Sequence, residues 1–143
     1  ATEGALMGLP ALAVSMDDFN PRDLSAQAAS TEALLHRIEW SALPPKCVLN
    51  LNFPACDLAQ AKDLAVCPHT RASYKDWYDS RRDPRGRPYY WLDGEIPPGQ
   101  ISAGRDRQLL TEGHVTLTPL RFDFNDPETR EALRAMLQKP ARH

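Results

Sequence analysis

The chain has 143 residues with 17 basic and 19 acidic side chains, and its formal net charge of −2 does not suggest a nucleic-acid coat or a membrane-surface protein. Its length predicts a single domain, and its longest apolar run, near positions 11–16, is too short to cross a bilayer. Three cysteines without a CxxC pair argue against a disulfide framework or a zinc knuckle, and they favour a reducing, cytoplasmic location.

The first predicted elements are a short helix and an apolar strand. Residues 1–8 have helix-forming composition, and Gly8 followed by Pro10 ends that helix. The apolar run Pro10–Met16 lies between breaker residues, which is typical of a strand buried on both faces of a parallel sheet. Such a strand needs neighbours on both edges. Because a helix leads into it, we expect a further strand and helix before residue 1.

A second helix and a second strand follow. Apolar and small residues recur at spacings of three and four before Pro44, which predicts an amphipathic helix. Its expected inner face consists of Leu24, Ala28, Thr31, Leu35 and Ile38. The next strand is Cys47–Phe53, with Val48, Asn50 and Asn52 on one face and Leu49, Leu51 and Phe53 on the other. A strand, a helix and a strand in this order predict a parallel pair with a right-handed crossover.

The stretch from Leu64 to Leu92 is extended, aromatic and basic, and it predicts a β-hairpin arm around the turn Asp83–Gly86. The aromatic residues are Tyr74, Trp77, Tyr78, Tyr89, Tyr90 and Trp91. The basic residues are Arg71, Lys75, Arg81, Arg82, Arg85 and Arg87. Three functions are open for this surface: packing a subunit interface, gathering substrate phosphate, or binding single-stranded nucleic acid. Aromatic residues on paired strands favour the interface.

The last third of the chain predicts a turn of helix at Asp106–Thr111 and a strand at His114–Phe124. Pro119 inside that strand argues for a sheet edge or a bulge. A final helix begins after Asp126 as its cap and runs to about Gln138. The expected division is 1–66 for the trailing part of an α/β domain, 67–125 for the arm and closing strand, and 126–143 for the C-terminal helix.

Four motifs in the same order and spacing resemble the SurE family of survival proteins. They are Glu3-Gly4 leading through Gly8 and Pro10 to Ser15, the strand Leu49–Pro54, the turn Asp83–Gly86 with Tyr89–Trp91, and the stretch Thr111–Leu120. The resemblance covers essentially the whole chain. It implies an α/β fold, the C-terminal part of a Rossmann-like SurE fold with a protruding β-hairpin arm and a C-terminal helix.

The resemblance also implies an activity, a cofactor and partners. SurE proteins are metal-dependent phosphatases of nucleoside 5′- or 3′-monophosphates, and a divalent cation (Mg or Mn) is held by an Asp pair, a Ser and an Asn. The family exchanges the arm, here Tyr74–Trp91, and the C-terminal helix between subunits of a dimer or tetramer. The matching region begins after the metal-binding motifs, so we assign no catalytic, metal-binding or substrate-binding residue here. We expect a C-terminal half that is inactive without its N-terminal half.

Two alternatives to a nucleotidase half stay open: a non-catalytic oligomerisation element, and a nucleic-acid binding module that uses the basic aromatic arm. Asp17-Asp18 superficially resembles the family's metal-binding pair, but it is followed by Phe19 rather than glycine. We interpret it as a solvated turn in which Asn20 caps the next helix. Glu3 in the first turn of its helix is expected to give structural support rather than catalysis.

The amides of Asn50 and Asn52 share one face of a strand and either bond to nearby loops or point to a site at the strand's C-terminal end. The histidines are His36, His69, His114 and His143, and their spacing is not that of a metal site. Cys67 and His69 alone do not make one.

Overall fold

The computed structural model describes residues 1–21, 23–122 and 125–138. The helices are α1 (Thr2–Leu6), α2 (Ser25–Arg37), α3 (Asp106–Thr111) and α4 (Pro127–Leu137), with short 3₁₀ turns at Trp40–Ala42, Leu58–Gln60 and Pro98–Gln100. The strands are β1 (Ala11–Met16), β2 (Cys47–Phe53), β3 (Lys62–Val66), β4 (Lys75–Arg82), β5 (Pro88–Glu95) and β6 (His114–Arg121). The expected strand end at Phe124 and His143 lie outside the described residues.

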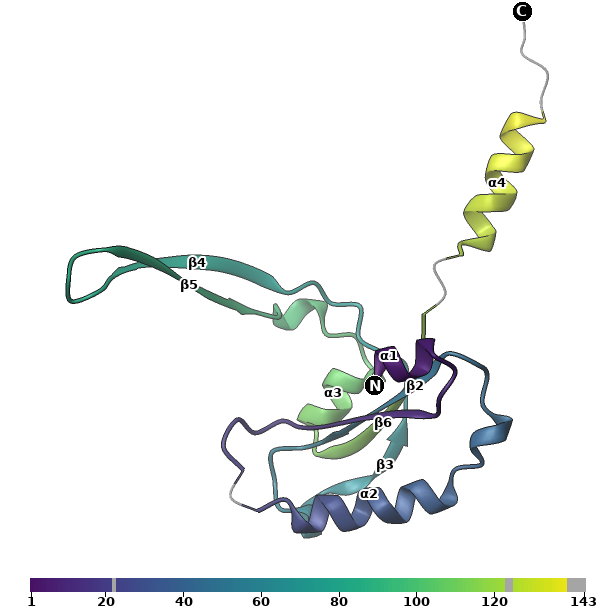
Figure 1. Ribbon diagram of the computed structural model, residues 1–143, viewed down its shortest axis with the longest axis horizontal. Helices are drawn as coiled ribbons and strands as arrows, with labels where there is room; N and C mark the ends of the chain where they lie inside the picture. Colours follow the sequence, from purple (N-terminus) through teal and green to yellow (C-terminus); the bar gives the residue numbers. More distant parts are fainter. Residues whose placement is uncertain (22, 123–124, 139–143) are drawn as a thin grey trace, which may run out of the picture.

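One four-stranded sheet, in the order β1-β2-β6-β3, forms the body of the molecule (Figure 1). The pair β1–β2 is parallel, as predicted for a strand–helix–strand unit. β6 runs antiparallel to β2 and parallel to β3, so the sheet is mixed. β3 was not predicted as a sheet strand, because its sequence is charged and its exposed edge position carries no apolar alternation.

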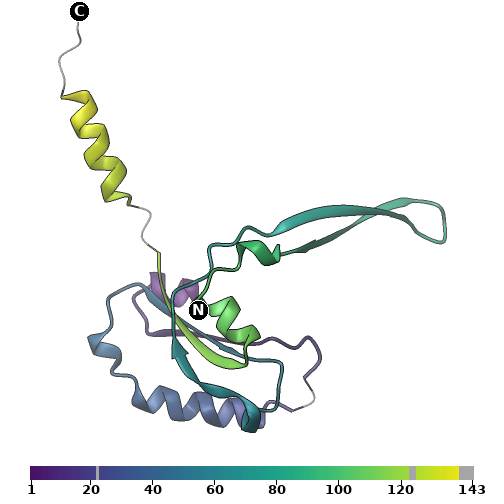
Figure 2. The same cartoon turned by 180° about the vertical axis from the view of Figure 1, so that it is seen from behind.

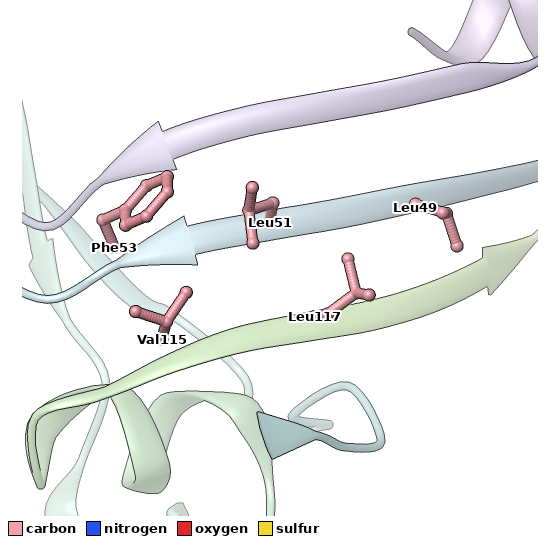
Figure 3. Close-up of a cluster of buried hydrophobic side chains, with 5 residues drawn as sticks. All are labelled: Leu49, Leu51, Phe53, Val115 and Leu117. Carbon is pink, nitrogen blue, oxygen red and sulfur yellow. The ribbon is translucent and has the colours of Figure 1, made fainter. Parts of the chain in front are cut away.

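The core lies on the face of the sheet that α2 covers. Figure 3 shows its buried side chains, which alternate along β2 and β6: Leu49, Leu51, Phe53, Val115 and Leu117. On the opposite face, Val48 of β2 packs with Ala5 of α1 and Ala11 of β1. The predicted two-faced pattern of β2 is therefore confirmed, and it separates an apolar layer under α2 from a smaller layer under α1.

The expected burial of the first strand is wrong, and the expected inner face of the second helix is confirmed in part. β1 is not buried on both faces, since Val14 is 47% exposed and none of the described strands pairs with its outer edge. Of the predicted face of α2, Ile38 packs on the core, whereas Leu24 and Leu35 are exposed and line a groove beside β1. Leu34, which the prediction left out, also packs on the core, because adjacent leucines offer two overlapping apolar stripes.

Pro119 lies neither in an edge strand nor at a bulge. β6 is an interior strand, and Pro119 stands opposite Leu49 in regular register with β2. The pairing of β3 with β6 extends only to Leu117, so the side of β6 that faces β3 is already open at Pro119. A proline without an N–H is accommodated there because no partner strand needs that donor.

The hairpin β4–β5 and the helix α4 project from the body in different directions, as Figures 1 and 2 show. The eight residues of β4 pair in register with those of β5, from Lys75 opposite Glu95 to Arg82 opposite Pro88. The predicted arm and its turn are thus confirmed, with Gly86 in the left-handed region at φ +80°. In α4 the predicted cap is also confirmed, since Asp126 accepts a hydrogen bond from the Thr129 N–H.

Candidate functional site

A polar pocket of about 240 Å³ lies on the side of the sheet that carries α3, beside the carboxyl-terminal part of β2. We call it the Asn–Asp pocket, and its lining residues are Asn50, Asn52, His69, Thr70, Ala72, Ile96, Asp106, Arg107, Leu110 and Thr116. They come from β2, α3, β6 and the two segments that enter and leave the arm. Ligands of open α/β sheets bind at the carboxyl ends of parallel strands, so this is a favoured place for a site.

Asp106 is the anchor of the pocket. It is only 7% exposed, and its carboxylate accepts hydrogen bonds of 2.7 Å from His69 Nδ1, the Thr70 N–H and the Arg107 N–H. Its own N–H donates to the Pro68 carbonyl at 3.1 Å. Burial raises the pKa of this carboxyl, whereas the hydrogen bonds from Thr70, His69 and Arg107 lower it. Together these hydrogen bonds outweigh burial, so the net pKa is below its ordinary value. An ionised Asp106 therefore ties the base of the arm to α3.

His69 is oriented by this contact. Because Asp106 accepts at Nδ1, the Nδ1 atom carries a proton and Nε2 is the free nitrogen of the ring. The side chain of His69 is 59% exposed. A second contact fixes the same segment, since Arg105 Nη1 donates to the His69 carbonyl at 2.6 Å.

The end of β1 also reaches the pocket. Arg107 Nη1 lies 3.4 Å from Asp17 Oδ1, and Asp17 directly follows β1. The Asp17 N–H extends the β1–β2 ladder by donating to the Phe53 carbonyl at 2.9 Å. The positive charge of Arg107 is therefore partly neutralised by a carboxylate from the neighbouring strand end.

Three polar side chains of the pocket lack partners among the described residues. Thr116 Oγ1 is fully buried and has no hydrogen bond there. The side-chain amides of Asn50 and Asn52 likewise form no hydrogen bond with the part of the chain that the structure describes. The two amides are partly exposed and open to a ligand, whereas the buried Thr116 hydroxyl costs the fold about 1–3 kcal/mol.

The structure separates the residues that the sequence singled out. Asp17 and Asp18 lie in an exposed turn as interpreted, but Asn20 does not cap α2: its N–H donates to Asp18 Oδ1 at 2.9 Å. The residue that precedes α2 is Leu24, without a side-chain cap, and Asp23 rather than Asn20 accepts a hydrogen bond from the Ser25 N–H at the start of the helix. Glu3 is exposed in the first turn of α1.

The histidines and Cys67 are dispersed. His114 Nδ1 lies 3.0 Å from the Asp63 carbonyl, and His36 is exposed on the last turn of α2. Cys67 Sγ is buried 3.7 Å from Thr118 Oγ1. Within residues 1–21, 23–122 and 125–138, three or more His, Cys, Asp or Glu side chains do not converge as a metal site would require.

Sequence reasoning identified Asn50 and Asn52 as residues that could face a site, and the structure places both in the pocket wall. It missed the contact between His69 and Asp106, which are 37 positions apart. The only local signal was an acidic residue at the start of a short helix, and such a residue usually serves the helix itself.

No helix among the described residues is both long enough and apolar enough to cross a membrane.

Fold and pocket together define an α/β protein with a mixed, Rossmann-like sheet and a polar site beside its parallel strands. A family model described as "Survival protein SurE" matches residues 1–76. The chain belongs to the SurE family, as its motifs predicted. The solved structure of the "Sure Protein from Aquifex aeolicus" is similar in fold, with a TM-score of 0.71 at 23% identity over 96% of this chain and 56% of that one.

Several curated relatives are named "5'-nucleotidase SurE". That of Nitratidesulfovibrio vulgaris (strain Miyazaki F) is 58% identical over 93% of this chain and 49% of its own length. That of Oleidesulfovibrio alaskensis is 52% identical over 97% of this chain and 54% of its own length. A more distant one from Synechococcus is 35% identical over 93% and 51%. The chain spans about half the length of the curated relatives it matches.

Proposed function

We propose that this chain is the C-terminal half of a nucleotidase that hydrolyses the phosphomonoester of nucleoside 5′-(or 3′-)monophosphates. The observation that carries this proposal is the Asn–Asp pocket, a polar site at the usual ligand-binding edge of the sheet whose asparagine amides have no partner among the described residues. The name shared by the relatives at 50–58% identity supports the choice of reaction.

The proposal includes an N-terminal half of the protein that completes the sheet beside β1. An apolar groove of about 470 Å³ runs between β1 and α2, and its lining includes Val14, Met16, Leu24 and Leu35. It borders the edge of β1 that has no partner among the described strands. A further strand and helix from the same protein would pair that edge and fill the groove.

The divalent cation, Mg²⁺ or Mn²⁺, belongs to the proposal for the whole protein. The described residues do not fit such an ion, because they bring no three acidic, His or Cys groups together. We therefore place its ligands outside these residues and derive no catalytic step through it.

We further propose that the arm Tyr74–Trp91 and α4 assemble the protein into a dimer or tetramer. The apolar side chains Leu133, Met136 and Leu137 of α4 are exposed, as are the aromatic residues of the arm. Three arm arginines are already engaged: Arg81 with Asp79, Arg87 with Asp83, and Arg82 with the Gly86 carbonyl. Arginines paired in this way are less available to nucleic-acid phosphates, which favours the interface over the nucleic-acid alternative.

A cytoplasmic location is proposed from the three free cysteines, of which Cys67 is buried.

The activity is tested with the natural full-length protein. We expect phosphate release from AMP and GMP in the presence of Mg²⁺ or Mn²⁺ and none after EDTA. A folded protein that releases no phosphate from nucleoside monophosphates with either cation would refute the nucleotidase. The 143-residue chain alone is expected to be inactive, and cation-dependent release by it would refute the division into halves.

A further inference from the structure

The Asn–Asp pocket combines hydrogen-bonding groups that have no partner among the described residues with groups that are already paired. The side-chain amides of Asn50 and Asn52 line it without a hydrogen bond to the part of the chain that the structure describes. Thr116 also lines it, but its unpaired Oγ1 has less than 1 Å² of accessible surface and is out of reach of a ligand. The hydrogen-bonding groups open to a ligand are therefore the two amides.

The two unpaired amides are arranged along one line. Asn50 and Asn52 are two positions apart on β2, so their side chains lie on the same face, about 6.6 Å apart along the strand. Asn52 stands opposite Thr116 of β6, which places an amide and the unpaired hydroxyl on one face of neighbouring strands. Each carboxamide offers both donors and an acceptor. Such a row matches a planar heterocycle whose edge alternates donors and acceptors, as asparagine does with adenine.

The charges of the pocket argue against a phosphate ligand. Arg107 is paired with Asp17 at 3.4 Å, and His69 is paired with Asp106 at 2.7 Å. Asp17 offsets the guanidinium of Arg107, and Asp106 adds a negative charge, so the pocket holds no surplus of positive charge for a dianion. A neutral polar ligand does not need such a surplus.

The walls and size suit a flat ring. Leu110, Ile96 and Ala72 line the pocket with apolar side chains, against which the face of a ring can pack. The volume of about 240 Å³ is smaller than the roughly 300–1,000 Å³ of sites that enclose a whole small ligand. The pocket therefore suits one part of a nucleotide rather than all of it.

We propose that the Asn–Asp pocket binds the nucleobase of a nucleoside ligand, with Asn50 and Asn52 bonding to the base edge. This inference rests on the proposed nucleotidase function for the identity of its ligand. It assigns substrate recognition to this chain, separately from the phosphate and cation chemistry.

The test measures binding of adenosine and guanosine, which lack phosphate, to the natural full-length protein by calorimetry. Asn52→Leu keeps the side-chain size and removes both hydrogen-bonding atoms, and we expect nucleoside binding to weaken about tenfold or more, the effect of about 1.4 kcal/mol. Asn20→Leu is the control, because Asn20 is exposed in the turn before α2 and its side chain is outside the pocket. Equal binding by the wild type and both variants would overturn the proposal.

Thr116→Val is a second control variant that retains the shape of the side chain. Because it removes an unpaired buried hydroxyl that has no surface open to the ligand, we expect it to melt at or above the wild-type temperature and to bind nucleosides as the wild type does. A loss of nucleoside binding equal to that of Asn52→Leu would show a general disturbance of this face and would overturn the role of the Asn52 amide.

A parallel assay separates this proposal from the proposed function. We expect Asn52→Leu to raise KM for AMP about tenfold while leaving KM for ribose 5-phosphate, which has no base, unchanged. Nucleoside binding by a protein that hydrolyses no phosphomonoester would support the pocket and refute the nucleotidase. Hydrolysis of AMP by a wild type that binds no nucleoside, or an equal rise in KM for both substrates, would overturn the pocket proposal alone.

Discussion

The sheet body and the hairpin arm are held together in different ways. In the body, side chains such as Leu51 and Phe53 are 1% exposed and pack between the sheet and α2. In the arm every residue of β4 is exposed, although its backbone pairing with β5 is complete. Backbone hydrogen bonds give small net stabilisation because they replace bonds to water, whereas apolar burial contributes in proportion to area. The arm is thus an element whose apolar surface is available for a partner.

The register of the arm shows how that surface is divided. Tyr78 and Leu92 are opposite each other on one face, together with Tyr90 opposite Ser80. The other face carries Trp91, over which the guanidinium of Arg81 lies 5.5 Å from the ring centroid. A cation over an aromatic ring satisfies part of that second face internally. The first face, with its tyrosines and leucine, is the better candidate for an interface.

The largest expected effect is a truncation in the body. Leu51→Ala leaves a cavity in the core, and we expect it to lower the free energy of unfolding by about 2–5 kcal/mol, measured by urea denaturation of the natural full-length protein. Tyr78→Ala in the arm removes more atoms, yet at a protein concentration where the subunits are dissociated we expect a change within about 0.5 kcal/mol, because Tyr78 is 70% exposed in the single chain. Equal losses in the two variants would contradict the distinction between body and arm.

The second effect concerns Asp106, which connects the sheet body to the base of the arm. Asp106→Asn keeps the shape of the side chain but removes the charge that accepts from His69 and Thr70, and we expect a loss of about 1–3 kcal/mol at pH 7. Asp18→Asn is the control, because among the described residues Asp18 accepts only the Asn20 N–H, in an exposed turn. A change within about 0.5 kcal/mol is expected there.

The difference in stability between the wild type and Asp106→Asn is expected to depend on pH. The folded-state pKa of Asp106 lies below its ordinary value of 3.8, so its stabilising contribution is fully present above the unfolded pKa and is lost as pH falls through the folded one. In thermal melts we expect the difference between wild type and Asp106→Asn to be constant near neutrality and to shrink below about pH 4. A difference that grew in acid would contradict the ionised anchor.

A smaller effect is expected from the base of the arm. At Gly94 an added Cβ would contact the Tyr74 ring and lie 2.8 Å from the Lys75 carbonyl oxygen. We expect Gly94→Ala to strain this end of the hairpin by about 1–3 kcal/mol and to speed amide hydrogen exchange in β4. Gly99→Ala is the matched control, since a Cβ there has no neighbour within 4 Å. Identical exchange in both variants would show that the Tyr74–Gly94 contact does not hold the arm.

The smallest effect on unfolding is expected at the outer arm, where assembly is the sensitive readout. Tyr90→Ala is predicted to change the free energy of unfolding by less than about 0.5 kcal/mol and to reduce the oligomer mass seen by light scattering at low concentration. Ser80→Ala, directly opposite on the same face, is predicted to leave that mass unchanged. An oligomer that is indifferent to both changes would refute an interface on this face.

Much of the architecture follows from the sequence alone. The positions of glycine and proline and the spacing of apolar residues were sufficient to predict α1, β1, β2, the hairpin and the capped α4. Each of these elements depends mainly on residues close in the chain. The motifs around Leu49–Pro54 and Thr111–Leu120 were sufficient for the family.

Tertiary structure alone decided the orientation of α2, the interior position of β6 and the composition of the Asn–Asp pocket. Asp106 meets His69 across 37 positions, and Asn52 meets Thr116 only because β6 returns antiparallel beside β2. The sequence determined which side chains could hydrogen bond on that face of β2. Their gathering in one pocket with residues of α3 and β6 depends on strand register and packing, which local patterns do not encode.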